Sequence, residues 1–462
     1  MPDPDITLVN VYSCLRHGEA PAPEVYLPLG CLYLIAALRD AGIRVEFRDY
    51  QIFSQGLSFP LDLGHFEKFL EDSAPIVGVS CMVSMLPFVL LGTKRFKEKH
   101  PEQKIILGGP GPSGTPDAII SHLPWVDVVV RGEGEATLVE VMQALTNGGD
   151  LSPIRGITYR DREAVHRNAS RPRLRDLDRL SFPAYDAVDV SKYTNVSVIT
   201  GRGCPFKCAF CDVGPLWENK VFLRSVDNVL AEIALLCRHH DLNRVNLVDD
   251  TFTLQRARTQ EICRGIAGLD ITWSCLSRID VLDEDLLVTM AKAGCDSIFL
   301  GIESGSNTVL EKINKRFTIQ EATHKVDMAA SHMDRVITSF MWGFPFESMD
   351  DFKLTLFSIV SMWYLKAMTG LMLLSPMPLS KLGIEYRDQI DFSEELCSVF
   401  ASLGNVTPGM KRKRAELPDE FKTVIRNYPD IFEGFYYIKS DSILDKASYL
   451  EGFCRRFGID AE

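Results

Sequence analysis

The chain has 462 residues, of which 46% are hydrophobic, and its 50 basic and 62 acidic side chains give a formal net charge of −12. This balance argues against a general nucleic-acid-binding protein, because such a protein needs a basic face for the phosphate backbone. The length corresponds to about three units of ~150 residues, and the apolar content is ample for several buried cores.

The N-terminal residues give no sign of a targeting segment. Residues 1–5 (MPDPD) lack basic side chains, and no apolar stretch of a signal peptide follows them. No apolar run approaches the ~20 residues that cross a bilayer. We therefore expect a cytoplasmic protein with no membrane span, in which the 12 cysteines are thiols or metal ligands. The basic run at residues 411–414 is interpreted as a solvated loop.

Residues 1–146 alternate short apolar strands with amphipathic helices. The pattern predicts strands at residues 6–11, 45–47, 76–80, 105–107 and 126–130, and helices at 29–41, 88–99 and 135–145. Such alternation predicts an α/β fold with a doubly wound, Rossmann-like parallel sheet. Ligands of these sheets bind beyond the carboxyl ends of the strands, which here lead into residues 80–87, 108–115 and 131–135.

The rest of the chain divides into three predicted parts. Residues 147–195 are polar and turn-rich, which indicates a linker with a small hairpin at 156–160 and 164–167. A second alternating series fills residues 196–381, with strands predicted at 196–200, 244–248, 272–277, 297–301, 336–341 and 371–374. Six such units make a partial or a full parallel barrel, and the pattern leaves both open. The aromatic-rich residues 382–462 predict a small, mostly helical cap that could determine the substrate.

Three closely spaced cysteines directly follow the first strand of the second series. In GRGCPFKCAFC at residues 201–211, Cys204, Cys208 and Cys211 have the spacing C-x3-C-x2-C. Thiolates are the usual ligands of iron–sulfur clusters, and three of them leave one iron of a [4Fe–4S] cubane open. An open coordination site is typical of catalysis rather than structure. Structural zinc is the alternative, but zinc usually takes four ligands and no second cysteine pair lies nearby.

The residues around the cysteines suit a reactive loop. Arg202 and Lys207 place positive charge near the thiols, so we expect them to favour the ionised form. Glycines at positions 201, 203 and 214 allow sharp turns of the backbone.

With this motif in place, residues 196–375 resemble the radical-SAM family. The resemblance implies that the open iron binds the amino and carboxylate groups of S-adenosylmethionine. It also implies that one electron, from a donor such as flavodoxin or ferredoxin, cleaves the sulfonium and yields a 5′-deoxyadenosyl radical. The residues that the resemblance assigns to S-adenosylmethionine are Phe210 and Gly343 near the adenine, Asp250 near the methionyl amino group, Arg278 at the methionyl carboxylate, and Glu303 and Ser304 near the ribose or amino group.

Residues 1–146 resemble the cobalamin-binding domain that precedes the barrel in many radical-SAM enzymes. The D-x-H-x-x-G motif of the cobalamin mutases is absent, so the resemblance implies a cobalamin without a protein histidine on cobalt, its lower face near residues 80–87. The sequence has Gly111 where many relatives carry histidine after Gly-Gly-Pro. An accessory domain without a corrin is the alternative. The residues assigned to cobalamin are Ser80, Gly108, Gly109, Pro110, Gly132, Glu133 and Gly134.

Together the two resemblances imply a cobalamin-dependent radical-SAM methyltransferase. Its substrate would be an unactivated carbon or phosphorus of a small-molecule or peptide natural-product intermediate. Ring contraction and oxidative cyclisation use the same cofactors and are alternatives. A methylthiotransferase would need a second cluster, toward which only Cys14 and Cys81 point, without a convincing third cysteine. A non-catalytic corrinoid or iron–sulfur sensor would not need an open iron.

Overall fold

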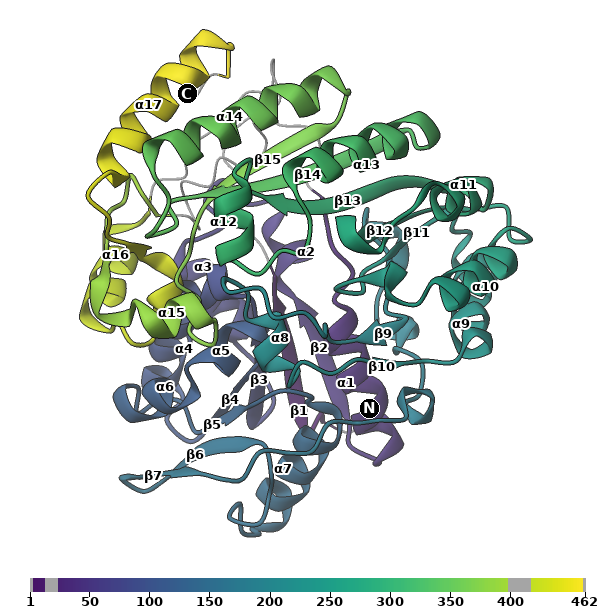
Figure 1. Ribbon diagram of the computed structural model, residues 1–462. Coiled ribbons are helices and arrows are strands. Elements are labelled where there is room, and N and C mark those ends of the chain that lie inside the picture. Colours follow the sequence, from purple (N-terminus) through teal and green to yellow (C-terminus); the bar gives the residue numbers. More distant parts are fainter. Residues whose placement is uncertain (1–2, 13–23, 398–416, 460–462) are drawn as a thin grey trace. The chain divides into compact units, whose positions relative to one another are not determined.

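The computed structural model describes residues 3–12, 24–397 and 417–459 (Figure 1). The chain forms two compact units, one from residues 1–195 and 417–432 and the other from residues 196–416 and 433–462. It passes from one unit to the other after residues 195, 416 and 432. The predicted basic loop at residues 411–414 lies outside the described residues.

The first unit is built on a seven-stranded sheet with the order β2-β1-β3-β4-β5-β6-β7. The first five strands are parallel, and every residue of β1 is buried, as expected for a sheet covered on both faces. The order reverses between β1 and β3, which is where sheets of this kind bind ligands. The strands are β1 (Ile6–Val11), β2 (Val45–Asp49), β3 (Ile76–Cys81), β4 (Lys104–Gly108), β5 (Val128–Val130), β6 (Ile157–Asp161) and β7 (Ala164–Arg167).

The hairpin that the sequence places in a linker belongs to this sheet. β6 pairs antiparallel with β5, and β7 pairs with β6. Ile157 and Tyr159 are buried, so alternate residues of β6 extend the apolar face of the sheet, while all of β7 is exposed. Residues 147–195 thus include the last two strands of the first sheet, and β7 forms its edge.

Helices cover the first sheet, and one of them comes from near the C-terminus. Phe421 of α16 packs against Phe88 of α4 with 6.2 Å between ring centroids, and Arg95 pairs with Glu420 at 2.9 Å. The helices of this unit are α1 (Leu29–Asp40), α2 (Tyr50–Ser54), α3 (Leu63–Leu70), α4 (Leu86–Lys99), α5 (Pro110–Gly114), α6 (Pro116–His122), α7 (Glu135–Asn147) and α16 (Asp419–Asn427).

The second unit contains a six-stranded parallel sheet whose order, β15-β14-β13-β12-β11-β8, follows the chain. Helices α9, α10, α11, α13 and α14 lie along its outer side (Figure 1). Among the described residues β8 does not pair with β15, so the barrel is partial and not closed. The strands are β8 (Ser197–Val198), β11 (Arg244–Leu247), β12 (Thr272–Ser277), β13 (Cys295–Glu303), β14 (Arg335–Trp342) and β15 (Met368–Leu373).

The predicted fold class is confirmed, including the mostly helical C-terminal part. Phe432, Phe435 and Tyr436 are buried, so these aromatics serve as core residues. No helix within the described ranges is long and apolar enough to cross a membrane.

The helices of the second unit are α8 (Val213–Leu216), α9 (Val226–His240), α10 (Arg256–Ile266), α11 (Glu284–Lys292), α12 (Asn307–Lys312), α13 (Ile319–His332), α14 (Met349–Tyr364), α15 (Lys381–Glu385) and α17 (Ile443–Arg456). Its two short pairs of strands are β9 (Gly201–Arg202) with β10 (Phe222–Leu223) and β16 (Ile390–Asp391) with β17 (Tyr437–Ile438).

Candidate active site

The three cysteines lie on one loop between β9 and α8, and each is half-buried. Cys211 N donates to Cys208 O at 3.2 Å, which folds the C-terminal part of the loop into a tight turn. Burial raises the pKa of Cys204 and of Cys211, and the charge of the nearby Cys208 thiol adds to the rise in both. Within the described residues no three His, Cys, Asp or Glu side chains converge on one metal ion. A cubane does not need such convergence because each thiolate binds a different iron, so the donor set fits a [4Fe–4S] cluster.

The expected effect of Arg202 and Lys207 on the thiols is wrong. Burial is the largest influence, and it raises the pKa of Cys204 and raises that of Cys211 to about 11. Lys207 is exposed, so water screens its charge. The thiolate form therefore depends on metal ligation itself, which displaces the protons.

Arg278, at the end of β12, is the cation that reaches the cysteine loop. Its Nη1 donates to Cys208 Sγ at 3.2 Å, and its guanidinium lies 3.7 Å from the centroid of the Phe206 ring. Nε and Nη2 donate to the two carboxylate oxygens of Asp280 at 2.9 and 3.0 Å. Three of the five guanidinium N–H groups are thus directed to these protein atoms.

The cysteine loop is also held through its backbone. Ala209 N donates to Ile313 O at 3.0 Å, and Leu382 N donates to Ala209 O at 2.9 Å. The side chain of Asn314 donates to Lys207 O at 2.8 Å. Segments that follow α12 and begin α15 therefore fix the middle of the loop from two directions.

A buried polar network fixes the chain just before the loop. Asp249, which follows β11, accepts hydrogen bonds from both N and Oγ1 of Thr200 at 2.6 Å. Arg258 donates to Thr200 O and to Arg224 O, each at 2.9 Å. Burial raises the pKa of Asp249, whereas the hydrogen bonds from Thr200 lower it. Asp250 is exposed, so of these two neighbouring carboxylates Asp249 supports the loop and Asp250 points away from the core.

Lys315 is a site residue that the sequence analysis missed. It is 8% exposed, and its Nζ donates to Glu303 Oε1 and Gly301 O, both at 3.0 Å. Its Nζ also lies 5.7 Å from the centroid of the Phe210 ring, within range of a cation–π interaction. Lys315 therefore links the end of β13 to the aromatic residue of the cysteine loop. Nothing in the polar run NKRFT at residues 314–318 signals that this lysine is buried.

Glu303 has a backbone conformation that residues other than glycine rarely adopt. Its φ is +77°, which costs a non-glycine residue roughly 1–2 kcal/mol. The buried ion pair with Lys315 holds it there. Strain of this kind concentrates at functional sites, so the conformation supports a role for Glu303 in ligand binding.

The other predicted contacts of S-adenosylmethionine fall in two places. The rings of Phe210 and Phe344 lie 6.4 Å apart, which brings the turn after Gly343 beside the cysteine loop. Gly343 has φ +84°, and a Cβ there would lie 2.5 Å from Leu373 Cδ1, so any other residue would be strained in this conformation. Ser304 Oγ is instead engaged with Thr355 Oγ1 at 3.2 Å and with Ser306 N at 3.1 Å.

In the first unit, the predicted cobalamin residues form tight glycine turns at strand ends. Ser80 lies opposite Gly108 across β3 and β4. Gly109 has φ +87°, and a Cβ there would lie 2.8 Å from Ser80 Oγ. Gly111 is packed as closely: a Cβ added there would lie 2.9 Å from Met82 O. This backbone conformation therefore leaves no room for a histidine. Such close-packed glycine turns let backbone N–H groups approach a nucleotide tail, so they are compatible with a bound cobalamin.

The last predicted turn of this set is partly occupied by protein contacts. The carboxylate of Glu133 accepts from Leu174 N at 2.8 Å and lies 3.5 Å from Arg173 Nε. Gly132 is exposed with φ +73°, and Gly134 packs against Leu34, whose Cδ2 would lie 3.0 Å from a Cβ. Pro110 is exposed at the start of α5.

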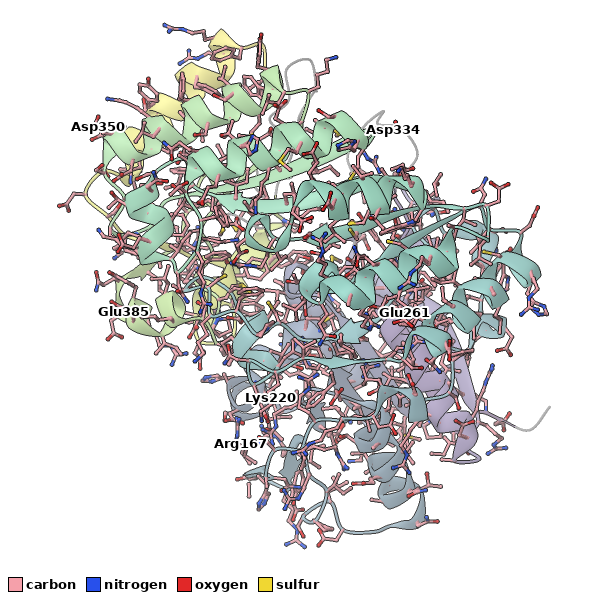
Figure 2. The ribbon with its side chains drawn as sticks, turned by 45° about the vertical axis from the view of Figure 1, so that its right-hand side comes forward. Arg167, Lys220, Glu261, Asp334, Asp350 and Glu385 are labelled. Atoms are coloured by element: carbon pink, nitrogen blue, oxygen red, sulfur yellow. The ribbon has the colours of Figure 1, made fainter. Side chains whose placement is uncertain are left out.

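Two further sequence expectations concern other parts of the chain. Cys81 is 2% exposed, and burial raises its pKa strongly, whereas Cys14 lies outside the described residues. In the segment 382–462, where the sequence predicts a substrate-determining cap, Glu385 is exposed on α15 (Figure 2). Tyr437 of the same segment is buried, with its hydroxyl 3.5 Å from Asp391 Oδ2.

Comparisons with known proteins agree with both units. The model of the Radical SAM superfamily matches residues 198–359, and the model of the B12 binding domain matches residues 20–142. An uncharacterized methyltransferase of Pyrococcus horikoshii is 32% identical over 337 residues, which cover 71% of this chain and 72% of the relative. A cytidylyl-2-hydroxyethylphosphonate methyltransferase of Streptomyces wedmorensis is 26% identical over 74% of this chain and 73% of its own. An anaerobic magnesium-protoporphyrin IX monomethyl ester cyclase of Rubrivivax gelatinosus is 26% identical over 78% of this chain and 66% of its own.

Two solved structures share the fold. The radical S-adenosylmethionine methyltransferase TsrM of Kitasatospora setae, solved with cobalamin and a [4Fe–4S] cluster, has a TM-score of 0.65 and 20% identity, covering 83% of this chain and 78% of its own. The cobalamin-dependent S-adenosylmethionine radical enzyme OxsB has a TM-score of 0.66 and 19% identity, covering 98% of this chain and 66% of its own.

A three-cysteine loop on a partial barrel, together with a doubly wound domain, defines a radical-SAM enzyme. The chain belongs to the family of cobalamin-dependent radical-SAM enzymes, which carry a B12-binding domain. The cofactors of this family are a [4Fe–4S] cluster, S-adenosylmethionine and cobalamin.

Proposed function

We propose that the protein is a methyltransferase that moves a methyl group from methylcobalamin to an unactivated carbon or phosphorus of a small-molecule or peptide substrate. The observation that carries this proposal is the three-cysteine loop beside Glu303 and Lys315, in a chain whose first unit matches the B12 binding domain. Relatives described as methyltransferases support it. The relatives described as cyclases favour oxidative cyclisation on the same cofactors as the second candidate.

We assign the cluster to Cys204, Cys208 and Cys211, whose thiols share one loop. When bound, the cluster and S-adenosylmethionine supply hydrogen abstraction from the substrate, and cobalamin supplies the methyl group. Arg278 donates a hydrogen bond to Cys208 Sγ, and such bonds to a ligand sulfur withdraw negative charge from it and raise the reduction potential of a cluster.

We assign S-adenosylmethionine to the face where the cysteine loop meets the ends of β13 and β14. Phe210 offers a ring for the adenine, and Glu303 offers a carboxylate oxygen for the ribose hydroxyls or the amino group. Lys315 holds Glu303 in place and keeps its charge balanced. The exposed Asp250 and the two remaining guanidinium N–H groups of Arg278 suit the ends of the methionyl group.

We also propose an acidic electron carrier, such as flavodoxin or ferredoxin, as the reductant in a cytoplasmic setting. Lys207, Arg316 and Lys381 are exposed and take part in no ion pair among the described side chains. They lie on the three segments that hydrogen-bond to one another at the cysteine loop. In a chain of net charge −12, these cations offer an acidic partner a local place to dock near the cluster.

Changing Gly109 to alanine tests the cobalamin assignment. The new Cβ would lie 2.8 Å from Ser80 Oγ in a backbone with φ +87°, so the turn must shift. We expect the affinity for hydroxocobalamin, measured by absorbance titration, to fall by about tenfold or more, which corresponds to roughly 1.4 kcal/mol. Gly30→Ala, on α1 with open space around its Cβ, is the matched control and should bind normally. Normal binding by a folded Gly109→Ala variant would contradict the assignment of this turn.

Methyl-labelled S-adenosylmethionine tests the proposed reaction. The oxygen-free enzyme is incubated with the labelled compound, a reductant and an extract that contains the substrate. We expect label in a new methyl group bound to carbon or phosphorus. A ring-contracted or cyclised product without label would favour the second candidate function. A cofactor-loaded enzyme that forms neither product nor deoxyadenosine would contradict both candidate functions. The non-catalytic corrinoid or iron–sulfur sensor would then be the remaining alternative.

A further inference from the structure

A fully buried ion pair joins α17 to the turn after β14. The side chains of Lys446 and Glu347 are both 0% exposed, and Lys446 Nζ lies 3.1 Å from Glu347 Oε2. Lys446 Nζ also donates to Glu347 O at 2.6 Å. The same Oε2 accepts a hydrogen bond from Gly343 N at 3.0 Å. One carboxylate oxygen therefore connects the C-terminal helix to the backbone of Gly343.

The carboxylate of Glu347 depends on Lys446 for its charge balance. Glu347 Oε1 is buried and has no hydrogen-bond partner among the described residues. Burial raises the pKa of Glu347, and among the interactions that lower it the charge of Lys446 has the largest effect. A buried carboxylate without its cation takes up a proton or moves toward water. Either change weakens its hold on the N–H of Gly343.

Apolar contacts place α17 over the same turn. Ile443, three residues before Lys446 on α17, puts its Cδ1 3.2 Å from where a Cβ of Gly343 would stand. Farther along, Tyr449 and Phe453 pack against Phe352 and Trp363 of α14, with ring centroids 6.4 and 5.9 Å apart. The helix is thus fixed on α14 and presents one apolar and one charged side chain to the turn.

We propose that α17 sets the conformation of the turn at Gly343 for S-adenosylmethionine, and that Lys446 is the positioning residue through which it acts. The inference rests on the proposed assignment of Gly343 to the cosubstrate. It gives the C-terminal helix a role in cosubstrate binding, although Lys446 itself contacts no ligand. Without Lys446 the turn keeps its sequence but loses the hydrogen bond that orients its backbone.

The test compares Lys446→Met with Arg455→Met, which removes an exposed cation from the same helix. Both proteins are loaded with iron and sulfide without oxygen, and the dissociation constant of S-adenosylmethionine is measured by equilibrium dialysis. We expect full iron content in both, affinity weakened about fivefold or more in Lys446→Met, and normal affinity in Arg455→Met.

A double variant separates positioning from stability. Lys446→Met with Glu347→Gln removes both buried charges, so we expect it to melt close to wild type, as replacements of buried ion pairs by neutral residues often do. Its affinity should still be about fivefold weaker, because α17 no longer holds the turn. Affinity that recovers together with folding, or a folded Lys446→Met that binds within about twofold of wild type, would overturn the inference. A cluster-loaded wild type that binds no S-adenosylmethionine would overturn the proposed function instead.

Discussion

Replacing Cys204, Cys208 or Cys211 by alanine is expected to abolish the cluster and all deoxyadenosine formation. Each thiolate binds a different iron, so two of them cannot retain a cubane that leaves its fourth iron open. The measurements are iron and sulfide content after oxygen-free reconstitution, and deoxyadenosine released with dithionite and S-adenosylmethionine. Cobalamin binding should persist, since the first unit contains none of these cysteines.

Cys237→Ala is the control for the cysteine variants. Cys237 is half-buried on α9, away from the loop, so this variant should keep its cluster and its activity. Full activity from any of the three loop variants, or a fourth protein ligand that permanently caps the cluster in Mössbauer spectra, would refute the assignment.

Replacing Lys315 by methionine is expected to reduce deoxyadenosine formation by roughly 100-fold. The side chains of Lys315 and Glu303 are 4% and 9% exposed, so removing the lysine leaves a buried carboxylate unpaired. Breaking such a pair costs about 3–5 kcal/mol. Glu303, already at φ +77°, should then leave its present conformation, and Phe210 loses the cation beside its ring. The initial rate is measured with dithionite as the reductant.

Two further variants show whether the effect of Lys315 is local. Lys292→Met, at the exposed end of α11, should keep the wild-type rate. Lys315→Met with Glu303→Gln should recover thermal stability but not the rate, because the glutamine lacks the negative charge assigned to ligand binding. A Lys315→Met variant with a normal rate would show that the pair is only structural.

Much of the fold follows from hydrophobic periodicity. β1 and β12 have the predicted bounds: β1 is buried along its whole length, and β12 alternates fully buried residues with more exposed ones. The first strand of the barrel is shorter than predicted, Ser197–Val198, since the chain leaves the sheet early to form the cysteine loop. The addition of β6 and β7 to the first sheet could not be predicted, because strand pairing between distant segments leaves no local pattern.

The site was predictable where the chemistry is local in sequence. The spacing of Cys204, Cys208 and Cys211 predicts a cluster loop without a structure. The glycines at strand ends likewise predict the turns that are assigned to cobalamin. Lys315 and the contact of Arg278 with Cys208 arise only from folding. Lys446 did leave a signal: it shares one face of α17 with Ile443 and Leu450, and a charged residue in an apolar stripe needs a buried partner.

The return of residues 417–432 to the first unit has a consequence for protein synthesis. The ribosome delivers the N-terminal sheet first and α16 only after almost the entire barrel has emerged. Until then Phe88 and its neighbours on α4 lack the cover that Phe421 provides. The N-terminal unit therefore completes its packing late in translation, and a nascent chain that stalls before residue 417 carries an uncovered apolar face, the kind of surface that chaperones bind.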